Sequence, residues 1–443
     1  MIPLSFTHVI VGGGLSGSLA LIELLRKYTA PISIAVLEES PHRLFKGKAY
    51  SADVSVQVLN VPADHMSAYW DQPLHLVQWL EARGLNYGAS DFIPRQLYGS
   101  YLAETVHEAL GTHPQHRVQF FMERLEAIQP DGHNGYALRS AKHDFSAQHV
   151  WIATGNFSPA DLVSDTEVVQ HPNYLGDPWR GAGLRFIPNG ASILLVGTGL
   201  TMVDQVLSLQ AQGHHGAIFA LSRRGFYPQP HQSSPAYSWF ADYAGIPTSP
   251  LSLLQLVRSE VRRADELGIP WTSVVNDLRT YTPMLWQQWD LSQRQQFLRH
   301  VRPYWEVHRH RLPADSIAAL NNLEQRGQLM RFAARLENVA ATEQGFCVRF
   351  VPRGARSAQT LDVNWILNCT GPQSLGKKLN EPWIQSGIAN DLLKSDALQL
   401  GIELGTKAND RLHLIGPPRK GSSWESTALR EIRQQVKEEV AKI

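Results

Sequence analysis

The sequence is poor in cysteine, balanced in charge and without a long apolar run, and each of these absences excludes a class of protein. Its two cysteines, Cys347 and Cys369, match neither a zinc-ligand spacing nor a C-x-x-C pair, which argues against a disulfide scaffold, a zinc module and a dithiol reductase. Lysine and arginine number 41 against 40 acidic residues, so no charge excess points to nucleic acid or an anionic membrane as a partner. No apolar run approaches the roughly 18 residues that a membrane span needs.

Length and composition instead indicate a globular chain of several domains. Hydrophobic residues make up 43% of the 443 residues, which is enough to bury a core, and the length corresponds to roughly three domains of about 150 residues. A strand pattern begins within the first ten residues, so we expect no signal peptide and a cytoplasmic location. No metal site is expected, because no ligand cluster with suitable spacing stands out.

The most informative segment is a glycine-rich loop near the N-terminus. The strand pattern His8–Val11 runs into Gly12-Gly13-Gly14-Leu15-Ser16-Gly17, and apolar residues then recur at helical spacing. A strand, G-x-G-x-x-G and a helix are typical of dinucleotide binding, because the glycines allow a tight turn, approach of a pyrophosphate and close helix packing. The next strand pattern, Ile32–Leu37, ends at Glu38, whose carboxylate suits the hydroxyls of a ribose. A glycine-rich turn with an incidental acid is the alternative.

The same template appears again from residue 193. Ile193–Val196 leads into Gly197-Thr198-Gly199-Leu200-Thr201-Met202, in which methionine replaces the third glycine. The spacing that leads from Gly12 to Glu38 leads from Gly197 to Arg223, which Arg224 follows. Arginine in the place of the acid favours the 2′-phosphate of NADPH over NADH. A solvated basic turn is the alternative.

A further similarity indicates that a whole domain is duplicated. Three segment pairs correspond: Arg124–Ile128 with Arg335–Val339, Gly135–Arg139 with Gly345–Arg349, and Thr154-Gly155 with Thr370-Gly371. Their offset stays within roughly 210 to 216 residues, as expected for a repeat. Because ligands of open α/β sheets bind at the carboxyl ends of the strands, both Thr-Gly turns are expected beside a nucleotide.

The predicted fold class is therefore α/β, with two Rossmann-like dinucleotide-binding domains and a mostly helical insertion. We expect an FAD domain over residues 1–185 and an NAD(P) domain over residues 186–372, with the insertion at about 226–330. Residues 373–443 are expected to return to the FAD domain and to end in a helix. The acid of the first copy and the arginines of the second favour FAD and NADPH as the two cofactors.

Longer segments beyond the glycine loops resemble one group of flavoproteins. They are Gly47–Ser51, Leu59–Ala63, Phe92–Leu102, Ser222–Gly225 and Gly416–Glu425. On these segments the chain resembles the FAD/NAD(P)-binding flavoprotein family that includes bacterial FAD-dependent urate hydroxylases. More distantly, it is similar to the ornithine/lysine N-monooxygenases.

The patterns and the resemblance together imply two sets of cofactor-binding residues. FAD would be bound by Gly12, Gly14, Leu15, Ser16, Gly17, Glu38, Asn60, Val61, Arg95, Thr154, Gly155, Gly416 and Trp424. NADPH would be bound by Gly197, Thr198, Gly199, Leu200, Arg223 and Arg224. The chain departs from related patterns in lacking the F-x-G-x-x-x-H-x-x-x-W-P signature of Baeyer–Villiger enzymes. It also has Gly416-Pro417 where a Gly-Asp pair often meets the ribityl chain.

The sequence identifies no catalytic residue, but it offers two candidates, one in the segment that follows the second strand of each template. Asn60 could bond a flavin carbonyl or the substrate, or could cap a turn before Pro62; His231 lies on a loop after the second nucleotide strand. The insertion at 226–330 is rich in tryptophan, histidine and arginine. Such a segment could bind an anionic planar substrate, help to hold the NADPH phosphates, or form a solvated basic face.

The last helix is expected to begin at a capping box, Ser422-Ser423-Trp424-Glu425, and to bury one face. That face comprises Leu429, Ile432, Val436 and Val440. In the folds that the chain resembles, the N-terminus of this helix points at the flavin, where its partial positive charge would stabilise an anionic reduced ring.

These features predict an FAD-dependent oxidoreductase that is reduced by NADPH. The first hypothesis is a single-component monooxygenase that uses O2 to hydroxylate a small polar substrate of the purine, amine or amino-acid class. One alternative is an NAD(P)H-dependent flavin reductase or oxidase without oxygen transfer, and another is a non-catalytic flavin-binding regulatory protein. The substrate, the atom that accepts oxygen and the oligomeric state stay open.

Overall fold

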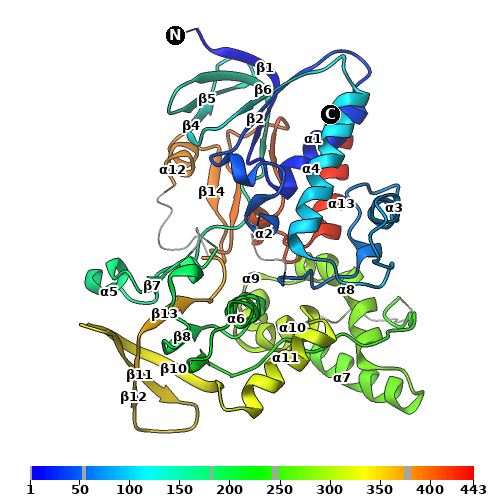
Figure 1. Ribbon diagram of the computed structural model, residues 1–443. Helices are drawn as coiled ribbons and strands as arrows, with labels where there is room; N and C mark the ends of the chain where they lie inside the picture. The colour runs from blue at the N-terminus through cyan, green and yellow to red at the C-terminus, as the bar shows by residue number, and fades with distance from the viewer. Residues whose placement is uncertain (1, 52–55, 180–182, 242–246, 248, 374–380) are drawn as a thin grey trace. The chain divides into compact units, whose positions relative to one another are not determined.

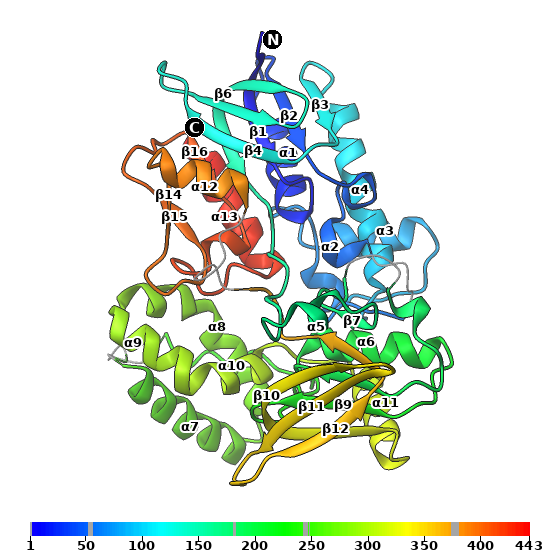
Figure 2. The same ribbon diagram turned by 90° about the vertical axis from the view of Figure 1, so that its left-hand side faces the viewer.

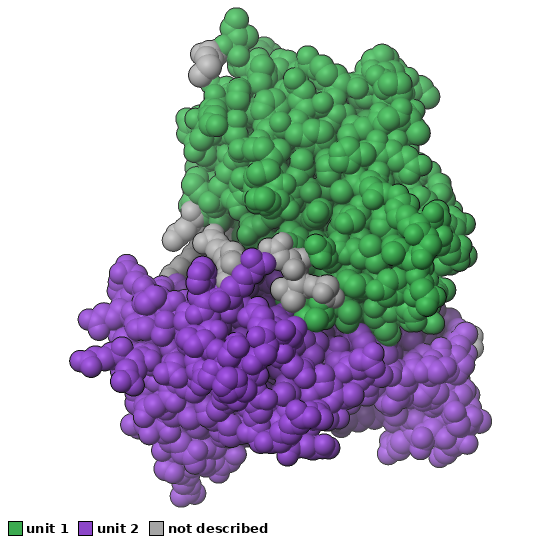
Figure 3. All heavy atoms as spheres, in the orientation of Figure 1, with its two compact units in different colours: residues 1–157, 282–291, 374–443 green, residues 158–281, 292–373 purple. Residues whose placement is uncertain are grey.

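The computed structural model describes residues 2–51, 56–179, 183–241, 247, 249–373 and 381–443. The chain divides into two compact units, which Figure 3 colours separately. Unit 1 comprises residues 1–157, 282–291 and 374–443, and unit 2 comprises residues 158–281 and 292–373. The division falls at 157/158 and not at the expected 185/186, because β7 (Tyr174–Leu175) pairs with β13 (Trp365–Asn368) of the second sheet.

Unit 1 is built on a sheet in the order β3-β2-β1-β6-β5-β4, in which β16 also pairs with β6 (Figures 1 and 2). The strands are β1 (Leu4–Val11), β2 (Ser33–Leu37), β3 (Arg117–Phe121), β4 (Leu125–Pro130), β5 (Tyr136–Ser140), β6 (Asp144–Ile152) and β16 (Leu412–Leu414). The pairs β1–β2, β1–β6, β2–β3 and β6–β16 are parallel, whereas β4, β5 and β6 form an antiparallel meander. The strand patterns expected before Gly12 and before Glu38 are thus confirmed as β1 and β2.

Helices cover both faces of this sheet, because alternate residues of its buried strands point to opposite sides. Ile10 belongs to the core beneath α1 (Leu15–Lys27), α4 (Arg95–Thr112) and α13 (Leu429–Ala441), which lie side by side in Figure 1. Val9 and Val11 belong to the core on the other side, with α12 (Pro382–Ala389). The remaining elements are α2 (Gly47–Tyr50), α3 (His75–Ala82), the hairpin β14 (Leu393–Ser395) and β15 (Ile402–Leu404), and short 3-10 turns at Pro41–Arg43, Ala63–His65 and Pro417–Arg419.

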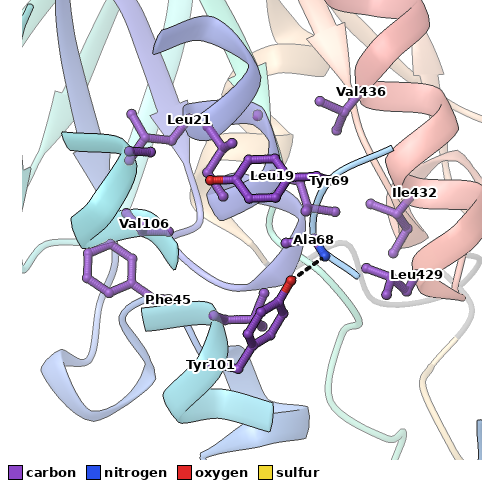
Figure 4. Packing of buried hydrophobic residues seen from close by; sticks show 14 of the residues in the cluster. Leu19, Leu21, Phe45, Ala68, Tyr69, Tyr101, Val106, Leu429, Ile432 and Val436 are labelled. Atoms are coloured by element: carbon purple, nitrogen blue, oxygen red, sulfur yellow. Dashed lines mark hydrogen bonds between the residues drawn. The ribbon is translucent and has the colours of Figure 1, made fainter. Parts of the chain in front are cut away.

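The larger core of unit 1 joins segments that are far apart in the sequence. Leu19 of α1, Val106 of α4 and Ile432 of α13 pack in one cluster (Figure 4). Tyr101 is fully buried there, and its hydroxyl accepts a hydrogen bond of 2.9 Å from the N–H of Ala68 (Figure 4). The insertion between β2 and β3 is therefore part of the core and not an appended loop.

Three histidines form a row on adjacent strands of unit 1: the buried His8 on β1, the partly buried His149 on β6 and the buried His413 on β16. The indole N–H of Trp151 donates to Nδ1 of His8 at 3.2 Å, and Nε2 of His8 has no partner in the described structure. His149 Nδ1 lies 3.4 Å from His413 Nε2, and His413 Nδ1 lies 3.3 Å from Glu439. Burial, together with electrostatic repulsion from His149 and His413, lowers the pKa of His8 to about 3. Burial, followed by His413, lowers the pKa of His149 to about 4.

We expect unit 1 to lose stability as the pH falls from about 6.5 towards 4. In the unfolded chain both histidines take up protons near their ordinary pKa of about 6.5, whereas in the folded unit they stay neutral. Each histidine then lowers the free energy of unfolding by up to about 1.4 kcal/mol for every pH unit below 6.5, until its folded-state pKa is reached. Glu439 adds to this loss only near the acid end of the window, where its carboxyl takes up a proton in the unfolded chain but not in the folded unit. Burial would raise the pKa of Glu439, but hydrogen bonds to His413 and Lys442 bring it to about 2.

The measurement is the thermal midpoint of the protein between pH 4.5 and 7.5. His8→Asn keeps an acceptor for Trp151 but removes one titrating group, so its midpoint is expected to fall less steeply with acid than that of the wild type. His42 is exposed, so His42→Asn serves as the control and is expected to follow the wild-type curve. An unchanged slope in His8→Asn would contradict this account.

Unit 2 repeats the architecture on a sheet in the order β12-β11-β10-β9-β8-β13-β7 (Figures 1 and 2). Besides β7 and β13, its strands are β8 (Ile193–Val196), β9 (Ile218–Ser222), β10 (Leu329–Thr342), β11 (Gly345–Pro352) and β12 (Gln359–Val363). Strands β8, β9 and the start of β10 are parallel, and β10, β11 and β12 form the antiparallel meander. The predicted duplication is confirmed, with β12 and β13 together taking the place that β6 has in unit 1.

The helices of unit 2 include the predicted helical insertion. They are α5 (Thr166–Gln170), α6 (Leu200–Ala211), α7 (Pro250–Glu266), α8 (Trp271–Gln288), α9 (Leu291–Gln296), α10 (Arg302–Arg309) and α11 (Ala314–Gln325), with short turns at Gly183–Phe186 and Phe297–Val301. Residues 282–291, which comprise the end of α8, the connection to α9 and the first residue of α9, belong to unit 1. A π-helical turn precedes α10, which has Pro303 in its first turn. Within the described part of the chain, no helix combines the length and apolar composition that crossing a bilayer requires.

Candidate functional site

The first glycine loop joins β1 to α1 and leaves the helix N-terminus without a side-chain cap. Gly12 has a φ of +100°, and its N–H donates to the carbonyl of Leu37 at 2.8 Å. Gly14 is the N-cap of α1, and Ser18 is the first residue whose N–H bonds back to it, at 2.8 Å. The N–H groups of residues 15–17 therefore have no acceptor within the helix. This is the arrangement that binds phosphate groups at helix N-termini.

The third glycine of the motif allows α1 to touch the strand. A Cβ at Gly17 would lie 1.9 Å from the carbonyl oxygen of Gly12 and 3.2 Å from a methyl group of Ile10. No side chain fits at those distances, so the packing role expected for this glycine is what the structure shows. In α6 the matching position holds Met202, which is fully buried.

The carboxylate of Glu38 folds back onto the glycine loop. One oxygen accepts from the N–H of Gly13 at 3.0 Å, and the other accepts from the N–H of Ser40 at 3.2 Å. Burial raises the pKa of Glu38, and these two N–H groups oppose the increase. Since a carboxylate has about four lone-pair sites, it can still accept hydrogen bonds from hydroxyl groups.

Two further predicted segments meet this loop. A Cβ on Gly12 would lie 2.9 Å from Cα of Thr154, and the hydroxyl oxygen of Thr154 is buried with no hydrogen-bond partner in the described structure. Gly155 follows with a φ of +72° and open space where a Cβ would stand. Gly416, with a φ of +76°, comes so close to Ser16 that a Cβ would lie 2.6 Å from its hydroxyl. The structure thus gathers both strand ends at the start of α1.

The two segments on either side of α3 run against each other in unit 1. Leu59 N–H donates to the carbonyl of Ile93 at 2.9 Å, and Arg95 N–H donates to that of Gln57 at 2.8 Å. Asn60 and Val61 are partly buried on this stretch, and Arg95 begins α4. The structure therefore brings Asn60 and Arg95 onto neighbouring segments. The flavin or substrate role of Asn60 and its capping role both stay predictions.

The expected start of the last helix is wrong. The helix α13 begins at Leu429, with Ala428 as the N-cap and no side-chain cap, while residues 422–427 form turns. Instead of opening a helix, Trp424 is buried against Trp286, with ring centroids 5.2 Å apart, and Lys420 lies 4.9 Å from its ring. The indole of Trp286 donates to the carbonyl of Gly421 at 2.9 Å. Burial of the two indole rings stabilises the turns, so the helix begins only after them. The expected apolar face, Leu429 to Val440, is confirmed as buried.

The second glycine loop reproduces the geometry of the first. Gly197 has a φ of +110°, its N–H donates to the carbonyl of Leu221 at 2.8 Å, and a Cβ would lie 2.2 Å from the carbonyl of Cys369. Gly199 is the N-cap of α6, with open space at its missing Cβ. Leu200 is the first residue of α6. Thr198 Oγ1 lies 2.8 Å from the hydroxyl of Ser222 and donates to the carbonyl of Phe226 at 2.6 Å.

The position equivalent to Glu38 is Ser222 and not Arg223. Gly12 bonds to Leu37 and Gly197 to Leu221, so the residue after the strand contact is Glu38 in unit 1 and Ser222 in unit 2. The constant spacing therefore pointed one residue too far along the chain, because the segment from the glycine loop to Leu221 is one residue shorter than the segment from Gly12 to Leu37. A small hydroxyl group where an acid would repel a phosphate, with an arginine next to it, keeps the preference for a 2′-phosphate.

The two arginines after Ser222 differ in their surroundings. Arg223 is exposed, whereas Arg224 donates from Nη1 to the hydroxyl of Tyr304 at 3.0 Å, and its guanidinium lies 5.0 Å from the centroid of that ring. The ring of Phe226 lies 5.4 Å from the same tyrosine. Arg223 can therefore reach a phosphate freely, and Arg224 is held in place.

The loop that carries His231 is tied to the segment between α10 and α11. His231 N–H donates to the carbonyl of Leu312 at 2.8 Å, and Leu312 N–H donates to that of Gln229 at 2.9 Å. His231 thus has a defined place within unit 2. Its catalytic role stays a prediction.

Two residues of the site escaped the sequence argument. A Cβ on Gly14 would lie 3.0 Å from Cα of Gly47, so Gly47 borders the first loop, although it was noted only as part of a resembling segment. Tyr304, which holds Arg224, comes from the insertion. No local sequence pattern connects Gly47 with the first glycine loop or Tyr304 with Arg224, because both contacts exist only in the folded chain.

Comparisons with known proteins agree with this architecture. Residues 9–157 match a family model described as FAD-NAD(P)-binding. Among curated protein sequences, none matches this chain with statistical significance.

Solved structures with the same fold cover nearly the whole chain at low sequence identity. An L-lysine 6-monooxygenase from Pseudomonas syringae is 16% identical, with a TM-score of 0.66 over 99% of each chain. An ornithine N-hydroxylase from Kutzneria sp. 744, in complex with reduced FAD, NADP+ and L-ornithine, is 14% identical, with a TM-score of 0.63 over 99% of this chain and 98% of that one. The bacillithiol disulfide reductase of Staphylococcus aureus is 14% identical, with a TM-score of 0.55 over 99% and 98%. The chain therefore has the fold of two-domain FAD/NAD(P)-binding flavoproteins.

Proposed function

We propose that this chain is an FAD-dependent monooxygenase that NADPH reduces. The observation that carries the proposal is that two glycine loops, each leading into a helix without a side-chain cap, have different neighbours. The loop of unit 1 lies against the carboxylate of Glu38, and the loop of unit 2 lies against Ser222, which Arg223 and Arg224 follow. The first environment suits a ribose with free hydroxyl groups, and the second suits a ribose with a 2′-phosphate. One chain with both sites holds an electron donor and an acceptor.

The residues around the first loop fit FAD. Residues 15–17 would donate N–H groups to its pyrophosphate, and Glu38 would accept from its adenosine ribose. The buried, unpartnered hydroxyl of Thr154 and the open space at Gly155 stand where the cofactor would supply the missing contact. Asn60, Val61, Arg95, Gly416 and Trp424 would lie along the rest of the molecule. When bound, FAD supplies the hydride acceptance and the oxygen chemistry that no side chain of the chain provides.

In unit 2, the first turn of α6 and the glycines would hold the NADPH pyrophosphate. Arg223 would donate to the 2′-phosphate, and Arg224, fixed by Tyr304, would add positive charge beside it. The protein would bind and orient both nucleotides and exclude water from the reaction.

For the substrate we propose a small polar, nitrogen-containing molecule. The structural neighbours include hydroxylases of L-lysine and L-ornithine, and the sequence resembles the family that includes urate hydroxylases. An amine, an amino acid and a purine share the need for hydrogen bonds in a polar pocket. The proposed class therefore comprises these three kinds of molecule.

Disulfide reduction fits this chain less well, although a disulfide reductase shares its fold. Cys369 is buried, and burial raises the pKa of its thiol well above the usual range. A thiol that stays protonated is a poor nucleophile. Cys347 also has a raised pKa, because it is hydrogen-bonded to Asp362.

The test begins with the purified protein saturated with FAD and mixed with NADPH without oxygen. We expect the flavin to lose its yellow colour, faster with NADPH than with NADH. Oxygen is then admitted in the presence of purines, amines or amino acids, and stimulated NADPH consumption with a hydroxylated product is expected for one class.

Two other outcomes would reject the proposal in favour of its alternatives. Reduction followed by hydrogen peroxide alone, with every substrate class, would indicate an oxidase or a reductase. Bound flavin that NADPH does not reduce would indicate a regulatory protein. A chain that takes up no flavin would contradict the assignment of the first loop.

A further inference from the structure

Arg311 is buried in the helical insertion of unit 2, and none of the ion pairs between described residues joins it to a carboxylate. The residue is 7% exposed and lies in the short segment between α10 and α11. Its Nη2 donates to the side-chain oxygen of Asn276 on α8, and its guanidinium lies 5.8 Å from the ring centroid of Trp271. A buried cation usually has an anionic partner, because removing a charge from water is costly.

The hydrogen bonds of this guanidinium are incomplete along one edge. Its Nε is buried and has no hydrogen-bond partner in the described structure. Nε and Nη2 form the side edge of an arginine, whose two parallel N–H groups match the two oxygens of a carboxylate or phosphate. Asn276 supplies one oxygen to this edge, and the second position is empty of any acceptor that the structure describes. Asn276 itself is exposed, so it can move away and let an anion take both positions.

The surroundings add positive charge and a flat apolar surface. Burial, followed by the charges of Arg309 and Arg279, lowers the pKa of Arg311 to about 10. Arg309 is also buried, at 6% exposed. The ring of His308 stands edge-on to Trp271, with centroids 4.9 Å apart. Trp271 thus offers an aromatic wall next to the guanidinium.

We propose that the side edge of Arg311 binds an oxyanion, a carboxylate or a phosphate, in place of the Asn276 oxygen. The bidentate contact completes the hydrogen bonds of the guanidinium and offsets the positive charge that Arg311, Arg309 and Arg279 place close together. The aromatic wall of Trp271 favours a ligand whose anionic group is attached to a flat body. This site does not depend on the flavin chemistry proposed above, so the two proposals can be tested separately.

The test compares the thermal midpoint of the FAD-saturated protein in sodium chloride, sodium benzoate and sodium phosphate at equal ionic strength. The wild type is expected to show a saturable rise with benzoate or phosphate. Because phosphate also stabilises proteins in general by exclusion from their surface, only the difference between variants reports the site.

Asn276→Asp is the sharpest variant, because it supplies an internal carboxylate to the same edge. We expect it to raise the midpoint in chloride by about 2–4 °C and to remove the saturable response to added anions. Arg311→Met is expected to remove the response as well. Arg262 is exposed on α7, and the matched control Arg262→Met is expected to respond like the wild type.

The proposal is overturned if Asn276→Asp responds to benzoate and phosphate as the wild type does, or if the wild type shows no saturable rise with either anion. If Arg311→Met does not fold, the response of Asn276→Asp to benzoate and phosphate tests the proposal by itself. A tenfold weaker affinity of Asn276→Asp for NADP+ would support the site and assign it to a nucleotide phosphate. An unchanged affinity, with the benzoate response lost, would support it as a carboxylate site.

Discussion

Replacing Gly17 by alanine is expected to destabilise unit 1 by about 3 kcal/mol, one of the largest effects that a single methyl group can have. The new Cβ would lie 1.9 Å from the carbonyl oxygen of Gly12. Both atoms belong to the backbone of the glycine loop, so neither can rotate away, and α1 must move from β1. The same movement would displace the N–H groups of residues 15–17, and we expect the protein to lose its affinity for FAD as well.

The measurement is the thermal midpoint, with a drop of roughly 6–12 °C expected for a unit of this size, together with the amount of flavin retained on purification. Gly111→Ala is the matched control, because Gly111 lies near the end of α4 with nothing within 4 Å of its missing Cβ. That change is expected to leave stability unchanged or to raise it by up to about 1 kcal/mol. If Gly17→Ala retained its flavin and its midpoint, the close approach of α1 to β1 would be refuted.

Replacing Arg223 by glutamate is expected to weaken NADPH binding by about 100-fold and to leave NADH nearly unaffected. The variant removes a charge-assisted hydrogen bond, worth about 1.5–3 kcal/mol, and places a negative charge beside the 2′-phosphate. Arg223 is exposed, so the substitution should not disturb the fold. The measurement is the nucleotide concentration that gives half the maximal rate of flavin reduction without oxygen, for NADPH and for NADH.

Two comparison variants separate this effect from a general change of charge. Arg262→Glu makes the same charge reversal at an exposed position on α7 and is expected to change neither value. Tyr304→Phe keeps the ring against Arg224 but removes the hydrogen bond of 3.0 Å, so NADPH should bind only a few-fold more weakly. Equal losses for NADPH and NADH in Arg223→Glu would remove the 2′-phosphate assignment.

Sequence reasoning succeeded where a structure depends on neighbouring residues. The strands before Gly12 and Gly197, the glycine turns and the buried face of α13 follow from local periodicity and from glycine's conformational freedom. The duplication was also visible, because each copy retained its meander and its final Thr-Gly turn. The same local reasoning failed at the start of α13, since the capping pattern at residues 422–425 competes with the burial of Trp424 against Trp286, 138 positions away in the sequence.

The sequence by itself determined that two dinucleotide templates exist, in which order they come and which residues form their glycine loops. Only the tertiary structure decided that Ser222 matches Glu38, that Tyr304 holds Arg224, and that Arg311 is buried with one edge unfilled. The physical reason is that strand and turn preferences act over a few residues. Registers and buried polar contacts depend on loop lengths and on packing between segments that the chain brings together only when it folds.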